Sequence, residues 1–259
     1  MHFPIAIHIG EYKILLHAIL EPVAFFVGFR YFLYLKKKKG DAINSDNRTW
    51  IIIGAIFGAI IGSRLVGGLE NPVQLKRSGN MLLYFYTNKT VLGGLLGGLF
   101  GVELIKKAVK EKKASGDLFV YPIILAMIIG RVACFSMGVF EETYGVPTSS
   151  VLGLDLGDHL QRHPVALYEI VFLLLLWIGL RSVEKRYVLV NGGLFKMFMI
   201  AYLVFRFCLD FIKPVYEYSI GLSAIQITSV VGLLWYGRYI LNPKKFFQAK
   251  IVTSTRVYA

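Results

Sequence analysis

Long apolar runs separated by short polar segments make up most of the chain. Seven of these runs approach the roughly 20 residues that a helix needs to cross a lipid bilayer. They cover residues 12–35, 50–69, 91–105, 118–140, 164–180, 189–212 and 219–241. The pattern predicts an all-α, polytopic membrane protein with about seven transmembrane helices, in which residues 1–259 form a single helical domain.

The third run is the shortest, and it is unusually rich in glycine. Its glycines are Gly93, Gly94, Gly97, Gly98 and Gly101. Glycines at such spacing let a neighbouring helix approach closely. A segment of this length is also compatible with a partly re-entrant path through the membrane, and the pattern leaves both possibilities open.

Composition supports the membrane class. Of the 259 residues, 56% are hydrophobic, and the mean hydropathy is +0.59. These values exclude an ordinary soluble domain and a disordered chain. The net charge of +13 would suit nucleic-acid binding, but the chain has no nucleic-acid motif and its basic residues cluster in short segments between apolar runs.

The position of the basic clusters predicts an orientation. Every second loop is rich in lysine and arginine, as in residues 36–39 and 106–113. Because positive loops stay in the cytoplasm, the N-terminus is predicted outside and the C-terminus inside. An odd number of crossings agrees with that assignment. Residues 70–90 and 141–163 then form the outer segments, on the periplasmic or extracellular side.

Three charged residues, Arg131, Arg206 and Asp210, lie inside or at the edge of apolar runs. A charge in hydrocarbon is costly, so such residues usually face a protein interior or a wet cavity. Arg206 and Asp210 are four residues apart and can pair on one helix face. An arginine that is only partly neutralised suits an anionic phospholipid head group, with a carboxylate such as Glu141 or Glu142 across the cavity. The alternative is a structural salt bridge that fixes helix packing.

The segment HPVALYE supplies further candidates near an outer helix end. Pro164 is a helix-start signal, which places His163 at the positive end of the helix and Glu169 about a turn and a half deeper. An acid/base or head-group site is one interpretation. The other is capping and interface anchoring by His163 and Tyr168, with Glu169 as a structural partner.

Weaker candidates come from the first two runs, and the cysteines suggest no site. Arg64 is compatible with simple snorkelling to the interface. His17 and Glu21 are one turn apart and either line a cavity or form a polar pair between helices. Cys134 and Cys208 both lie in apolar runs, and their number and spacing predict neither a disulfide framework nor a metal site. The aromatic residues imply no cofactor.

Five motifs in this order resemble the bacterial prolipoprotein diacylglyceryl transferases over about residues 11–241. They are GSRL at 62–65, GGLLGG at 93–98, GR at 130–131, HPVALYE at 163–169, and the pair Arg206 and Asp210. Glu142 also keeps the family's three-residue spacing to a glycine, Gly145. Three positions depart from the family: Leu92 replaces a histidine, Cys134 an asparagine, and Asp210 a glutamate.

The resemblance implies an activity. Family members move the diacylglyceryl group of phosphatidylglycerol onto the cysteine thiol of a lipoprotein signal sequence, so that a thioether forms and glycerol phosphate leaves. It implies Arg131 and Arg206 as phosphate clamps, Asp210 as the group that orients Arg206, and Glu142 as a ligand of glycerol hydroxyls. With Leu92 in place of the histidine, the base is open among His163, His17 and a carboxylate.

The resemblance also implies the surroundings of the reaction. Substrate-binding positions are expected at Arg64, Gly93, Gly94, Gly145, His163, Tyr168, Glu169 and His17. The partners are phosphatidylglycerol, prolipoprotein signal sequences and the bacterial plasma (inner) membrane, with no metal and no cofactor, and the chain is expected to be a monomer.

Other functions remain compatible with the residues. A lipid-group transferase of the same architecture would use a different acceptor. A transporter or channel would suit charges at the midplane, although no paired interrupted helices occur in matching halves. A non-catalytic family member is favoured by Leu92.

Overall fold

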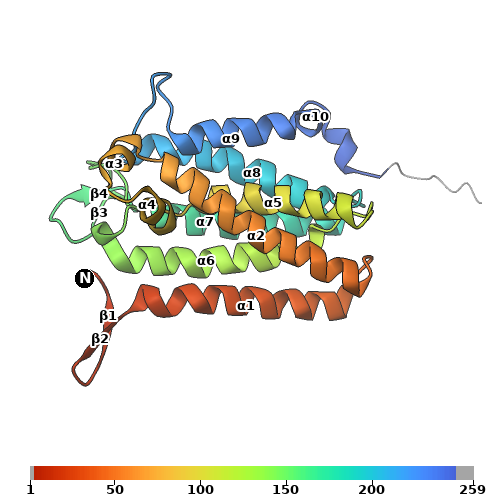
Figure 1. Cartoon of the computed structure of the whole chain (residues 1–259), viewed down its shortest axis with the longest axis horizontal. Helices are drawn as coiled ribbons and strands as arrows, with labels where there is room; N and C mark the ends of the chain where they lie inside the picture. The colour runs from red at the N-terminus through yellow and green to blue at the C-terminus, as the bar shows by residue number, and fades with distance from the viewer. Residues whose placement is uncertain (1–2, 249–259) are drawn as a thin grey trace, which may run out of the picture.

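The computed structural model describes residues 3–248. Within that range the chain is mainly helical, and its long helices lie side by side along one axis (Figure 1). They are α1 (Leu16–Lys39), α2 (Ser45–Leu69), α5 (Val91–Ala108), α6 (Val120–Met137), α7 (Val165–Arg186), α8 (Gly193–Leu209) and α9 (Ala224–Trp235). Successive long helices run in opposite directions, so that α1 begins and α9 ends at opposite ends of the bundle.

Short elements complete the ends of the bundle. They are β1 (Ala6–Ile9), β2 (Tyr12–Leu15), α3 (Pro72–Arg77), α4 (Met81–Thr87), η1 (Asp117–Phe119), η2 (Gly138–Phe140), β3 (Leu154–Asp155), β4 (Gln161–Arg162), η3 (Asp210–Ile212), α10 (Gly237–Ile240) and η4 (Pro243–Phe246). β1 pairs with β2 and β3 with β4, both antiparallel. Both hairpins lie at the same end of the bundle as α3 and α4 (Figure 1).

Helix composition agrees with a polytopic membrane protein. Among the described residues, four helical segments are long and apolar enough to cross a bilayer: α1, α2, α7 and the segment Asp117–Phe140, which joins η1, α6 and η2. α9 is apolar but shorter, with 12 residues. α5 is one continuous helix of 18 residues alongside α2, so the glycine-rich run forms a packed helix over its whole length.

Several predicted helix starts were wrong. Residues 12–15 form strand β2, because a turn at Gly10 (φ +61°) folds the chain back onto β1. α8 starts at Gly193, after the left-handed Gly192 (φ +81°). α9 starts after Ser223, which caps the helix and shares a capping box with Gln226. A helix start drawn from apolar content alone misses these turns and caps.

Several helix ends were also placed too early. α1 continues through the lysines at 36–39 and ends before Gly40, and α7 continues to Arg186. Basic residues in a last helical turn interact favourably with the helix dipole. A boundary drawn where hydropathy falls therefore cuts off the final turn.

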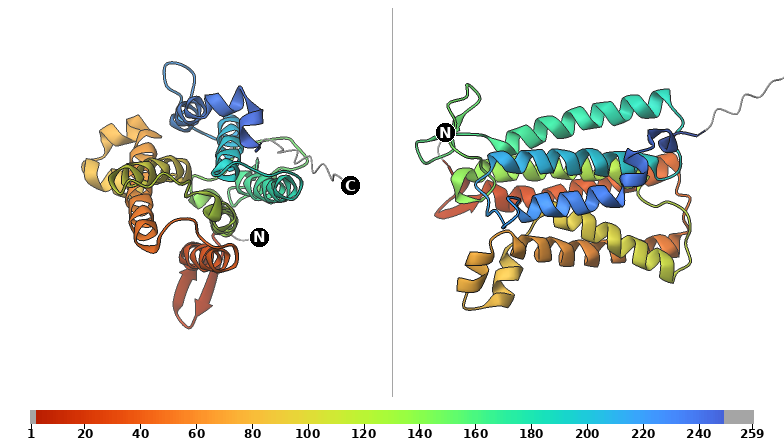
Figure 2. Two further views of the ribbon diagram at one scale, coloured as in Figure 1. Left: turned by 90° about the vertical axis from the view of Figure 1, so that its right-hand side faces the viewer. Right: turned by 90° about the horizontal axis from the view of Figure 1, so that it is seen from above.

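The glycines of α2 and α5 bring the two backbones into direct contact. A Cβ atom added at Gly58 would lie 2.3 Å from the carbonyl oxygen of Gly97, and one at Gly97 would lie 2.3 Å from the carbonyl oxygen of Gly58. Gly62 is in the same position relative to Gly93, at 2.4 Å. No side chain fits in this contact. The α2–α5 pair lies to one side of the other helices and reaches them mainly through α9 (Figure 2).

This contact gives a test of the packing. We expect Gly97→Ala to lower the melting temperature in detergent, because the new methyl group collides with backbone that cannot rotate away; overpacking typically costs about 1–3 kcal/mol. Gly179→Ala in α7 is the matched control, since a Cβ there has no neighbour within 4 Å. Equal melting temperatures for the two variants would contradict the backbone contact.

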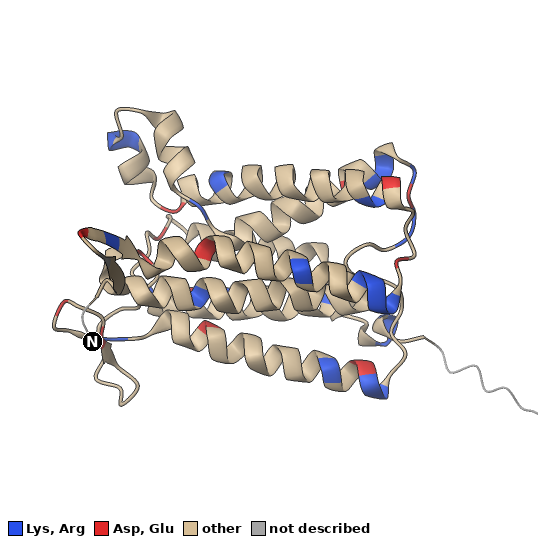
Figure 3. Cartoon of the chain, turned by 90° about the horizontal axis from the view of Figure 1, so that it is seen from below, with Lys and Arg blue, Asp and Glu red and all other residues tan. Residues whose placement is uncertain are grey.

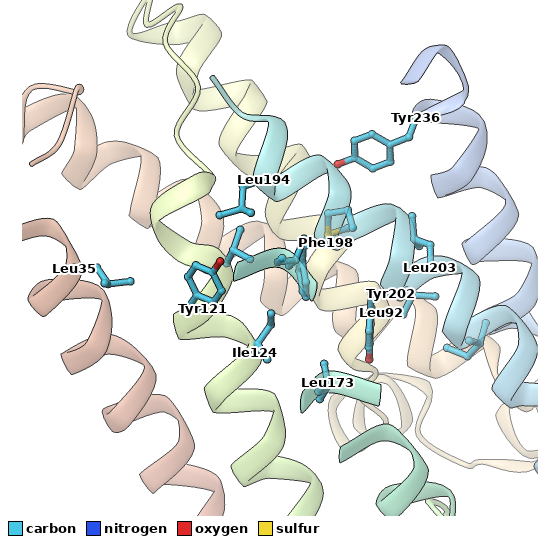
Figure 4. Close-up of a cluster of buried hydrophobic side chains, with 14 residues drawn as sticks. Leu35, Leu92, Tyr121, Ile124, Leu173, Leu194, Phe198, Tyr202, Leu203 and Tyr236 are labelled. Atoms are coloured by element: carbon cyan, nitrogen blue, oxygen red, sulfur yellow. The ribbon is translucent and has the colours of Figure 1, made fainter. Parts of the chain in front are cut away.

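The apolar core lies mainly between α6, α7 and α8 (Figure 4). Tyr121, Phe198 and Tyr202 are among its fully buried side chains. α5 contributes Leu92, which is 1% exposed. The position where the resembled family has a histidine is therefore occupied here by a packed core residue.

Charged residues are unevenly distributed along the bundle. Lysines and arginines gather at the end where α1 and α7 finish (Figure 3). The opposite end carries α3, α4 and both hairpins. The ion pairs described next lie toward this second end, because they come from the C-terminal parts of α6 and α8 and the N-terminal part of α7.

Candidate active site

A buried carboxylate, Glu169 of α7, joins three helices. Its Oε1 accepts a hydrogen bond from Tyr202 Oη at 2.9 Å and lies 2.8 Å from Arg131 Nε. Its Oε2 accepts from Arg206 Nη1 at 3.0 Å. Glu169 is 1% exposed. One carboxylate therefore holds two guanidinium groups, one from α6 and one from α8.

The predicted pair of Arg206 and Asp210 is present in the structure. Arg206 Nη2 lies 3.5 Å from Asp210 Oδ1. Asp210 Oδ2 accepts a hydrogen bond of 2.5 Å from the hydroxyl of Ser223. Because Ser223 also caps α9, this carboxylate links the end of α8 to the start of α9.

The cluster has hydrogen-bonding capacity that the protein does not use. An arginine offers five N–H donors. Arg206 Nε is buried and has no hydrogen-bond partner within residues 3–248. The side chains of Arg131 and Arg206 keep 10% and 8% exposure, so neither is completely sealed. The two interpretations of the arginines therefore both have support: the cluster ties helices together, and it leaves donors for an anion.

A second chain of contacts leads from Arg131 toward α1. Arg131 Nη1 lies 3.6 Å from Cys134 Sγ, and Cys134 Sγ lies 3.7 Å from Glu141 Oε1. Glu141 Oε2 lies 3.3 Å from His17 Nε2. Of the two adjacent acids, Glu141 is the one next to Arg131 and Cys134, whereas the sequence favoured Glu142.

Glu142 makes no ion pair with Arg131 or Arg206 among residues 3–248. Its charge acts on another acid, Glu70, which follows the C-terminal end of α2. Burial raises the pKa of the Glu70 carboxyl, the positive charges of Lys213 and Arg206 oppose this rise, and the negative charges of Asp210 and Glu142 add to it. The structure therefore does not bring Glu142 into direct contact with the arginines.

His163 and Tyr168 of the HPVALYE segment do not belong to the arginine cluster. They anchor the start of α7. His163 Nδ1 lies 3.1 Å from the Tyr168 hydroxyl. Gly145 donates its backbone N–H to the His163 carbonyl at 3.0 Å, and a Cβ atom at Gly145 would lie only 2.6 Å from His163 Cβ. Gly145 is therefore required for the close approach of residues 141–163 to this helix end.

Three predicted positions lie apart from the ion pairs. Arg64 stacks over Tyr86 of α4, with 5.0 Å between the guanidinium carbon and the ring centroid. Gly93 and Gly94 belong to the contact between α5 and α2. The structure therefore brings Arg131, Arg206, Asp210 and Glu169 together. Arg64, Gly93 and Gly94 lie apart from this cluster.

Comparison with known proteins adds to this geometry. A model of the family described as prolipoprotein diacylglyceryl transferase matches residues 4–241. The chain belongs to the prolipoprotein diacylglyceryl transferase family. The match covers the long helices and every residue of the site described above.

Relatives of similar length carry one name, phosphatidylglycerol--prolipoprotein diacylglyceryl transferase. The protein from Clostridium tetani is 27% identical over 231 residues, which cover 82% of this chain and 86% of the relative. The one from Finegoldia magna is 26% identical, with coverage of 88% and 90%. The one from Campylobacter hominis is 27% identical, with coverage of 92% and 91%.

Two residues that contact the cluster, Tyr202 and Ser223, were not predicted from the sequence. Tyr202 is four residues before Arg206 and on the same helix face, a spacing that indicated its position. Ser223 is the first residue of a Ser-x-x-Gln capping box, which marked the helix start.

His17 and Glu21 of α1, which the sequence placed one turn apart, contact different residues. Glu21 pairs with Lys89, whereas His17 faces Glu141. The contact of His17 therefore joins α1 to the segment after η2, and whether His17 takes part in a cavity or in a polar pair stays a prediction.

The space beside the cluster is small. A cavity of about 10 Å³ is lined by Cys134, Tyr144 and Pro164, among others. This is room for about one water molecule, much less than a phospholipid head group.

Proposed function

We propose that this chain transfers the diacylglyceryl group of phosphatidylglycerol to the cysteine thiol of a lipoprotein signal sequence. The relatives' names state the same lipid and a prolipoprotein. The observation that carries the proposal for this chain is the buried pair of arginines on one carboxylate, with donors to spare, in a member of that family.

The proposed reaction is a displacement at carbon. The thiolate sulfur attacks the diacylglycerol carbon that carries the phosphate oxygen; a C–S bond forms, the C–O bond breaks, and the electron pair leaves with glycerol phosphate. The leaving group gains negative charge as the bond breaks. Arg131 and Arg206 stabilise this charge with forked donors in a site of low dielectric constant, and Asp210 orients Arg206.

The remaining site residues have supporting roles in this proposal. Glu142 holds glycerol hydroxyls, a role that rests on the family resemblance of its three-residue spacing to Gly145. His163, Tyr168 and Gly145 shape the entrance at the start of α7, supported by their mutual contacts. Arg64, Gly93 and Gly94 contribute from the α2–α5 side, and His17 from α1.

The proposal includes a membrane topology. Seven helices cross the bacterial inner membrane, with the N-terminus outside and the C-terminus in the cytoplasm, and the chain acts as a monomer. The gathering of lysines and arginines at one end of the bundle supports this orientation. Residues 70–90 and 141–163 then face outward, next to the ion-pair cluster.

Mass spectrometry of a signal-sequence peptide tests the activity. Purified protein is incubated with phosphatidylglycerol vesicles and a peptide that contains the acceptor cysteine. We expect the peptide to gain one diacylglyceryl group and glycerol phosphate to appear in equal amount. A peptide with serine in place of the cysteine is the control and should remain unmodified.

The same reaction separates the alternatives. Release of glycerol phosphate without a modified peptide would indicate a different acceptor. Absence of both products, together with failure to complement a bacterial strain that lacks the transferase, would indicate a non-catalytic family member, as the leucine at position 92 suggests.

A further inference from the structure

Three potential metal ligands converge beside the arginine cluster. They are His17 in the first turn of α1, Cys134 in α6 and Glu141 just after η2. Their ligand atoms all lie within 4.8 Å of one another. We propose that these three side chains bind one Zn²⁺ ion and leave its fourth position open to the acceptor thiol.

The spacing of the ligand atoms matches a tetrahedral zinc site. Zinc binds sulfur at about 2.3 Å and nitrogen or oxygen at about 2.0–2.1 Å, so tetrahedral angles place nitrogen and oxygen about 3.3 Å apart and sulfur and oxygen about 3.6 Å apart. In the structure, His17 Nε2 lies 3.3 Å from Glu141 Oε2, Cys134 Sγ lies 3.7 Å from the other carboxylate oxygen, Oε1, and the three ligand atoms all lie within 4.8 Å of one another. Binding of an ion then requires the carboxylate to turn so that one of its oxygens faces both the sulfur and the nitrogen.

The hydrogen-bonding state of Glu141 also favours an ion. Its Oε2 atom is buried and has no hydrogen-bond partner in the described part of the chain, because the 3.3 Å pair with His17 lacks hydrogen-bond geometry. A buried carboxylate oxygen without a partner is costly. A zinc ion between the carboxylate and the imidazole would satisfy both groups.

The charges balance when zinc is bound. A thiolate at Cys134 and the Glu141 carboxylate together carry two negative charges, which neutralise Zn²⁺, and the imidazole of His17 is neutral. Arg131 is already paired with Glu169, and its Nη1 points at Cys134 Sγ from 3.6 Å. Such a donor stabilises the thiolate as an outer-shell contact of the metal.

The open position gives the site a role that rests on the proposed transfer activity. Three protein ligands and one exchangeable position are typical of catalytic zinc. A thiol that coordinates zinc loses its proton, here to water, and the bound thiolate is the nucleophile that forms the C–S bond. Zinc would thereby replace the base that Leu92 cannot supply, and it would hold the sulfur beside Arg131.

Metal analysis of the purified full-length chain tests the site directly. We expect about one zinc per chain in wild-type protein prepared without chelators. Cys134→Ser and His17→Gln should reduce zinc to background. The matched controls are Cys208→Ser and His159→Gln, which change an exposed cysteine and an exposed histidine outside the site and should keep full zinc content.

Cobalt provides a second measurement that does not depend on substitutions. Metal-free wild-type protein is prepared by chelation and titrated with Co²⁺. A thiolate-to-cobalt charge-transfer band should appear and saturate at about one equivalent, and Zn²⁺ should displace it. If wild-type protein is purified without zinc and also shows no cobalt band on titration, the metal site is overturned, whatever the transfer activity.

Transfer assays then separate the metal site from the activity. We expect chelation to lower the rate at least 100-fold and Zn²⁺ to restore it. Zinc-loaded wild-type protein that transfers nothing would reject the proposed function and leave the metal site in place. Unchanged transfer by metal-free protein would overturn the role of zinc in thiol activation.

Discussion

Arg131→Ala is expected to lower diacylglyceryl transfer by about 10²–10³-fold or more, the loss seen when one donor to a developing negative charge is removed. The effect should fall mainly on the rate of the chemical step. Arg131 is 9% exposed and is bound to Glu169, which places its guanidinium in an environment of low dielectric constant. Charge stabilisation there is much stronger than in water.

The conservative variant sharpens this prediction. Arg131→Lys keeps the positive charge but loses the planar fork that can contact Glu169 and a phosphate oxygen together. We expect it to recover only a small part of the activity. Arg30→Ala is the matched control, since Arg30 is an exposed arginine on α1. Transfer by Arg131→Ala at near the wild-type rate would refute the clamp.

Local spacing predicted one part of the site correctly. Arg206 and Asp210 are one helical turn apart, and that period alone places them on the same face. The other two ion pairs of the cluster, Arg131 with Glu169 and Arg206 with Glu169, depend on how helices pack. Nothing near Arg131 in the sequence indicates that its partner is Glu169, because the two residues meet only when α6 lies against α7.

The choice between Glu141 and Glu142 shows another limit. Adjacent residues in a turn point in different directions, and the direction depends on backbone angles that the sequence does not reveal. α6 ends at Met137, and the next residue, Gly138 with φ of +59°, starts the η2 turn. That turn directs Glu141 toward Cys134. The spacing to Gly145 favoured Glu142 because it reflects a family motif rather than the path of this turn.

The same reasoning explains why the cluster of His17, Cys134 and Glu141 was not predicted. His17 and Glu141 are far apart in the sequence, and Cys134 lies in an apolar run that carries no ligand spacing. Sequence patterns reveal metal sites when the ligands share one turn or helix. Here the three residues meet only through the packing of α1 against α6.

Glu169→Leu is expected to be the most destabilising single change in the chain. It leaves two buried guanidinium groups without their shared carboxylate. Loss of one partner of a buried ion pair typically costs about 3–5 kcal/mol, and here two cations lose the same partner. Thermal unfolding in detergent should show a large drop in melting temperature. A drop no larger than that of Gly179→Ala would contradict the central role of Glu169.

A triple variant separates packing from catalysis at this cluster. Asp210→Asn is made first, because Asp210 is buried and would otherwise lose its cation; on that background, replacing Arg131 and Arg206 with methionine together with Glu169→Leu removes the three remaining charges and fills the space with apolar side chains. Buried ion clusters replaced in this way often regain or exceed the original stability. We therefore expect the triple variant to melt near the wild-type temperature but to transfer no diacylglyceryl groups. If the cluster only tied α6, α7 and α8 together, the triple variant would recover transfer along with stability, and that result would remove the arginines from the mechanism.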